Sequence, residues 1–118
     1  MSVSYADKND IVTDNADYSC NHVLFKASHI KKYSLKAINS DLLESCRYHN
    51  KLVKSHYFII YKHLEICTCI ETDVLNKLKN NLTEEKQSSL LSCINKSYDT
   101  LKWLDKAIEN IISCRKLD

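Results

Sequence analysis

The chain of 118 residues contains no glycine and no proline, and this absence limits the folds open to it. Strand-rich folds use glycine and proline in tight turns and bulges, and doubly wound α/β folds need glycine where a phosphate approaches the backbone. Long helices joined by short polar turns need neither residue. The composition therefore predicts an all-α protein and excludes the glycine-rich loops that bind nucleotides.

The length and an apolar content of 44% fit one globular domain. Residues 1–19 are polar, acidic and poorly periodic, which predicts a flexible acidic N-terminal arm. Residues 20–118 are then expected to form a single helical domain.

Hydrophobic periodicity divides this domain into three predicted helices. The first is short and covers 22–38. The second covers about 41–79, because Asp41 followed by Glu44 is a capping box and one apolar stripe, interrupted by Glu71, continues to residue 78. The third covers about 84–115 after a polar break. The short loop predicts that the last two helices form an antiparallel hairpin, which the first helix covers.

Six cysteines are many for this length, and their numbering suggests how they pair. In a hairpin that turns at residue 80, residues at one level have numbers that sum to about 160. Cys46 with Cys114 and Cys67 with Cys93 both meet this condition, so these two disulfides are predicted, with Cys20 and Cys69 left for a third. Six cysteines permit fifteen pairings, and reduced thiols that pack as small apolar side chains are the alternative.

The histidines recur at seven-residue intervals, at His22 and His29 and again at His49, His56 and His63. One hypothesis is that this stripe loosens the packing when it becomes charged below about pH 6.5. A zinc site is not predicted. The pairs Cys46/His49 and His63/Cys67 would lie about 25 Å apart along one helix, too far to share an ion.

No other chemistry is predicted. No catalytic residues are assigned, because nothing in the pattern places a base and an oxyanion-binding group beside a nucleophile. No cofactor motif and no apolar run long enough for a membrane span are present. Nucleic-acid binding is not favoured either, since the net charge is only +2 and arginine occurs only twice.

A protein partner is the remaining expectation. The run from residue 57 to 61 cannot all face one side of a helix, so some of its side chains are expected either beneath the first helix or on a binding surface. The predicted partner-binding residues are Tyr57, Phe58, Tyr61, His56 and His63. Residues 21–63 hold eight basic and two acidic residues, a net charge of +6. This charge either belongs to an ordinary solvated helix face or favours an acidic partner.

The sequence thus predicts a small secreted helical protein of the effector or ligand type, non-enzymatic and stabilised by disulfides, that acts by macromolecular recognition. Two alternatives remain open. One is a cytoplasmic assembly or adaptor subunit with reduced cysteines between its helices. The other is a small helical carrier of an apolar ligand.

Overall fold

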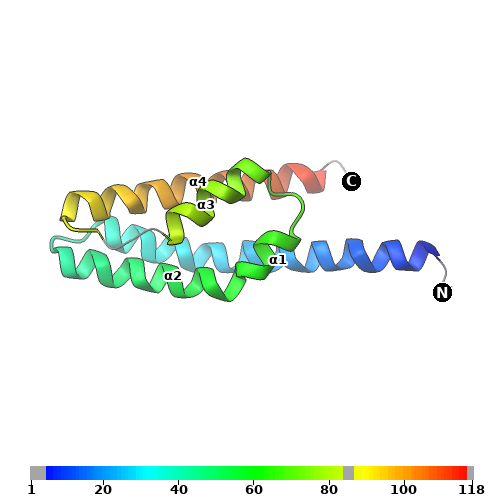
Figure 1. The fold of residues 1–118 in the computed structure, drawn as a ribbon, viewed down its shortest axis with the longest axis horizontal. Helices are drawn as coiled ribbons and strands as arrows, with labels where there is room; N and C mark the ends of the chain where they lie inside the picture. The colour runs from blue at the N-terminus through cyan, green and yellow to red at the C-terminus, as the bar shows by residue number, and fades with distance from the viewer. Residues whose placement is uncertain (1–4, 84–86, 117–118) are drawn as a thin grey trace.

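The fold was obtained as a computed structural model that describes the backbone of residues 5–83 and 87–116 and the side chains of 16–83 and 87–114. Four helices follow one another: α1 (Tyr5–Ile38), α2 (Leu43–Ile66), α3 (Thr72–Thr83) and α4 (Leu90–Lys116). They form an elongated bundle of 59 × 22 × 20 Å (Figure 1). The all-α fold class is confirmed.

Successive helices reverse direction, so that α1 runs opposite to α2, and α2 and α4 run the same way (Figure 1). The most extensive contact is between α1 and α2. Helix α4 packs against both of them, and α3 lies mainly on α4. The core is formed by the apolar stripes that the sequence indicated. Val53, Tyr57 and Ile60 of α2 are buried, as are Leu104 and Ile111 of α4.

The predicted second helix is not continuous, because α2 ends at Ile66 and α3 begins at Thr72. The N–H of Ile70 donates to the carbonyl of Cys67 at 3.2 Å, which closes a turn between the two helices. The N–H of Glu71 donates to Asn110 Oδ1 of α4 at 2.9 Å, which satisfies a backbone donor that the start of α3 would leave free. The interruption of the apolar stripe at Glu71 was the sequence signal of this break.

The cysteines pair as Cys20–Cys67, Cys46–Cys93 and Cys69–Cys114, and the predicted pairs Cys46–Cys114 and Cys67–Cys93 are wrong. The prediction assumed that α2 and α4 lie antiparallel. In an antiparallel pair, the residue numbers of two residues at one level have a constant sum. Because α2 is parallel to α4, residues at one level have a constant difference instead. The difference is 47 for Cys46–Cys93 and 45 for Cys69–Cys114.

The first helix is longer than predicted. It begins at Tyr5 instead of residue 22, and its first turns extend past the end of the other three helices (Figure 1). Residues 5–19, predicted as an arm, therefore belong to α1, and Ser19 within it is buried. The flexibility expected of residues 1–19 stays a prediction, and residues 1–4 lie outside the described part of the chain.

Candidate functional site

The two heptad series of histidines meet along one side of the contact between α1 and α2. These helices are antiparallel, and residues whose numbers sum to 85 lie at one level, as the ring contacts of His22 with His63 and of His29 with His56 show. We call the six residues in this register the histidine ladder. They are His22, His29 and Lys36 of α1 and His63, His56 and His49 of α2.

The rung nearest the 67–71 turn is a pair of stacked imidazoles. The rings of His22 and His63 are nearly parallel, with an interplanar angle of 6° and centroids 4.4 Å apart. Tyr18 stands edge-on to both rings, and Ser19 Oγ lies 3.0 Å from His63 Nδ1. Burial, and secondarily the facing His22, lower the pKa of His63 from its ordinary value. The lowered pKa favours the neutral imidazole of His63.

The middle rung joins His56 to three groups of α1. Its ring lies 5.2 Å from His29 and stacks on Tyr33 at 5.4 Å. Lys26 Nζ lies 3.4 Å from His56 Nδ1, and because an ammonium group can only donate, Nδ1 accepts in this contact. Burial, followed by the charges of Lys26 and His29, lowers the pKa of His56. The surroundings of His56 thus also favour its neutral imidazole.

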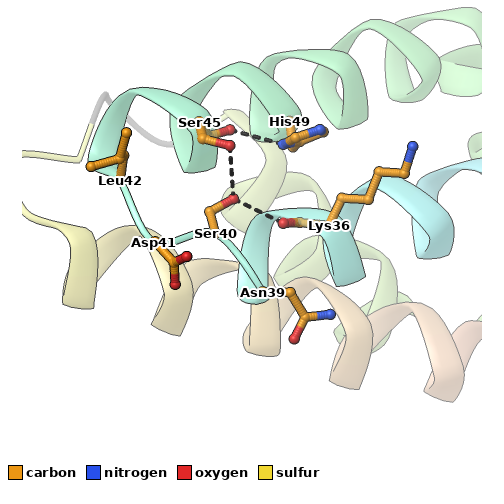
Figure 2. A pocket seen from close by; sticks show the side chains of 7 residues that line it. All are labelled: Lys36, Asn39, Ser40, Asp41, Leu42, Ser45 and His49. Atoms are coloured by element: carbon orange, nitrogen blue, oxygen red, sulfur yellow. Dashed lines mark hydrogen bonds between the residues drawn. The ribbon is translucent and has the colours of Figure 1, made fainter.

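The last rung, Lys36 with His49, lines a pocket at the α1–α2 turn (Figure 2). Ser40 Oγ donates to the carbonyl of Lys36 at 2.8 Å and lies 3.2 Å from Ser45 Oγ. His49 Nδ1 donates to the carbonyl of Ser45 at 2.9 Å, which fixes its ring beside the pocket. These bonds tie the turn together. Lys36 is exposed, and its ammonium lies 5.7 Å from the centroid of the Tyr33 ring.

Large apolar side chains flank the ladder on its outer side. Tyr18 and Phe25 of α1 are 60% and 65% exposed, and Ile59 and Ile66 of α2 are 59% and 45% exposed. Ile59 and Ile66 lie three residues after His56 and His63, and side chains so spaced are neighbours on a helix. Phe25 contacts His29, with ring centroids 5.5 Å apart. Four exposed apolar side chains on one face exceed the scattered single residues of an ordinary surface.

The residues predicted to bind a partner are divided among four environments. Tyr57 is buried in the core, so it offers no surface to a partner, while Phe58 is 58% exposed on α2. Tyr61 is half-buried and has Lys79 Nζ 5.0 Å above its ring. Only His56 and His63 belong to the ladder. The prediction missed Tyr18 and Phe25, which the antiparallel register of α1 and α2 brings beside these histidines.

Clusters of metal ligands and free thiols were looked for among the described residues. Within the described residues, no three histidine, cysteine or acidic side chains come together as a metal ion requires. All six cysteines are in disulfides, so none offers a thiolate nucleophile. The described helices include none that combines the length and apolar character needed to cross a membrane.

The histidine ladder and its apolar flanks are thus the most distinctive surface of the described chain. Comparison with protein-family models, with curated proteins and with solved structures finds no match to this chain.

Proposed function

We propose that this protein is a small secreted, non-enzymatic binding protein of the effector or ligand type, held together by disulfides and acting by macromolecular recognition. The observation that carries the proposal is that three disulfides connect distant parts of the helical bundle. Cys20–Cys67 joins α1 to the 67–71 turn, Cys46–Cys93 joins α2 to α4, and Cys69–Cys114 joins the turn to α4.

The disulfides support an oxidising location. Each closes a loop of 45 to 47 residues, which in the loop-entropy model stabilises the fold by about 4 kcal/mol. A domain of this size commonly has a total stability of about 5–15 kcal/mol. A chain that depends so strongly on disulfides suits the extracellular space, where disulfides persist, rather than the reducing cytosol.

The surface supports recognition as the activity. Exposed tyrosine, phenylalanine and isoleucine side chains surround the histidine ladder, and aromatic side chains are the residues that most often anchor protein interfaces. The ladder itself is built from ring contacts within the protein, which hold these flanking side chains on a rigid pair of helices. Rigid presentation lowers the entropy lost on binding.

The test of secretion and of the disulfides is the intact mass of natively sourced protein, alkylated before and after reduction. We expect no alkylation before reduction and six alkylated cysteines after it. Six free thiols in the unreduced protein would overturn the proposal and favour the intracellular adaptor, whose partner helices would then be sought. An apolar molecule retained in native mass spectrometry would favour the carrier instead.

A further inference from the structure

The apolar flanks of the histidine ladder repeat in heptads on both helices. Tyr18 and Phe25 are seven residues apart on α1, and Ile59 and Ile66 are seven apart on α2. The register that pairs His22 with His63 also brings Phe25 level with Ile59. Tyr18 lies level with Ile66 in the same way, since the residue numbers of each of these two pairs sum to 84. The face therefore has successive apolar levels about 10 Å apart along the bundle.

This repeat fits the packing of a third helix. Apolar residues that recur every seven positions on two neighbouring helices are the surface on which another helix packs in coiled coils and bundles. The levels between the flanks are filled by imidazole rings that stack on each other and on tyrosine, so the surface between them is flat and weakly polar when neutral. An amphipathic helix of about three turns would contact two levels.

The charge of the surrounding residues selects an acidic helix. Lys26, Lys32 and Lys36 follow the ladder along α1, and Lys32 and Lys36 are exposed. These three are among the eight basic residues of 21–63, a segment that has only two acidic residues. A helix with glutamate or aspartate beside its apolar stripe would pair with these ammonium groups and be steered to the face.

We propose that the α1–α2 face formed by the histidine ladder, Tyr18, Phe25, Ile59 and Ile66 docks an acidic amphipathic helix of a partner protein. The inference rests on the proposed function, since it specifies the partner of a recognition protein. The partner helix inserts apolar side chains between Phe25 and Ile59 and between Tyr18 and Ile66. Its carboxylates lie toward Lys32 and Lys36.

The test uses the full oxidised chain and a synthetic 21-residue helical peptide with leucine at heptad a and d positions and glutamate at e and g. A peptide of the same composition, scrambled so that its leucines share no face, is the control for charge alone. Fluorescence anisotropy of the labelled peptides measures binding. We expect saturable binding of the heptad peptide and at least tenfold weaker binding of the scrambled one, because only the former presents an apolar stripe.

Neighbouring residues of α2 provide a matched pair of variants. Ile59→Ser removes one flank of the face, and we expect it to weaken peptide binding about tenfold, as for an interface anchor. Phe58→Ser changes a side chain of almost equal exposure that lies two residues from His56, and therefore on nearly the opposite side of α2. It should leave the affinity within about twofold, a change too small for an anchor. Circular dichroism checks that both variants remain folded.

A second pair tests charge. Lys32→Glu should weaken binding about two- to fivefold, the size of an exposed ion pair, and Lys51→Glu on another side of α2 should weaken it less. Absence of saturable binding at about 1 mM peptide, or equal effects of Ile59→Ser and Phe58→Ser, would overturn the proposal. So would self-association of the chain that Ile59→Ser abolishes, since a second copy would then occupy the face. These outcomes leave the cysteine assay unchanged, which separates failure of the docking site from failure of the proposed function.

Discussion

The two edges of α2 differ in how they meet their neighbours. Along the edge toward α4, Cys46 is bonded to Cys93, and one turn later Asn50 contacts Ser97. Along the edge toward α1, the histidine ladder lies between the helices and is partly open to solvent. We call the side of α2 toward α4 the closed edge and the side toward α1, where the histidine rings lie, the open edge.

The difference follows from the residues that the neighbouring helices supply. On α4, Ser97 is small and buried, and its hydroxyl donates to Asn50 Oδ1 of α2 at 2.9 Å. On α1, the side chains beside the buried contact with α2 are rings and lysines that reach the surface. The closed edge is therefore held by a disulfide and a polar contact, whereas the open edge presents, beside its buried core contacts, a surface that another molecule can contact.

The largest expected effect comes from removing one disulfide at each edge. Cys46–Cys93 and Cys20–Cys67 both span 47 residues, so the loop-entropy model predicts the same loss of about 4 kcal/mol for each. The variants are the double substitutions Cys46→Ala/Cys93→Ala and Cys20→Ala/Cys67→Ala. Urea unfolding with fixed protein concentration measures the free energy of unfolding.

The two disulfide variants can also be compared with each other, because their losses in the free energy of unfolding are expected to differ. Cys20 and Cys67 belong to the main core, whereas Cys46 and Cys93 form a small separate cluster with Ala37. Loss of buried sulfur from the main core should therefore leave the more costly cavity, and we expect the Cys20/Cys67 variant to be the less stable of the two. A less stable Cys46/Cys93 variant would contradict this view and make the closed edge the main source of stability.

Sequence patterns predicted the helical fold and most of the buried faces, because apolar periodicity reports which side of each helix is covered. They failed on the pairing of the cysteines, because the turn at 67–71 was not recognised. This turn reverses the chain between α2 and α3, so that α4 runs parallel to α2 instead of antiparallel to it. Cys67 and Cys69 were the missed signal. In a continuous helix, residues two apart point to different sides, and here the turn lets them reach Cys20 and Cys114 respectively.

The candidate site was predicted only in part for a related reason. The heptad spacing of the histidines is visible in the sequence, but their partners depend on the register between α1 and α2. Once Cys20 is known to pair with Cys67, residues at one level of α1 and α2 must have residue numbers that sum to about 85. His22 must then face His63. The site is therefore a consequence of tertiary register, which local periodicity does not contain.

The next largest effect is expected from Asn50→Ala at the closed edge. Asn50 Nδ2 lies 3.1 Å from Cys93 Sγ, and its Oδ1 accepts from Ser97 Oγ at 2.9 Å. The buried Ser97 hydroxyl would keep only its bond to the carbonyl of Cys93, at 3.2 Å, so we expect the loss of one hydrogen bond, about 0.5–1.5 kcal/mol. Asn76→Ala on the exposed side of α3 is the control and should stay within about 0.5 kcal/mol. Equal thermal unfolding of the two variants would show that the polar contact adds nothing to the closed edge.

A smaller effect, of the opposite sign, is expected in the core between the two edges. Among the described residues the buried hydroxyl of Tyr57 has no hydrogen-bond partner, and burial raises the pKa of this group to about 12. Tyr57→Phe removes the buried polar atom and keeps the ring, so the fold should be unchanged or stabilised by up to about 1 kcal/mol. Chemical denaturation measures the change. A loss of more than about 1 kcal/mol would mean that the hydroxyl is satisfied in solution.

The smallest expected effect is a dependence of stability on pH that belongs to the open edge. In the folded state, His56 faces Lys26, His29 and Tyr33, and the pKa of His56 lies below its ordinary value of 6.5. The unfolded chain therefore binds the proton first as the pH falls. Stability is fully present above about pH 6.5 and decreases as the pH falls below it, and burial of His63 acts in the same direction.

Thermal unfolding at pH 7.5 and 5.5 measures this effect, because most carboxylates titrate below that range and histidines within it. We expect a lower midpoint at pH 5.5 and a smaller difference between the two pH values in the variant His56→Gln/His63→Gln. Lys51→Gln, a change of an exposed residue away from the ladder, should keep the full difference. Identical midpoints for the unsubstituted protein at both pH values would show that the open edge tolerates charged imidazoles. The ladder would then be a passive support for the flanking apolar residues, with no penalty for protonation.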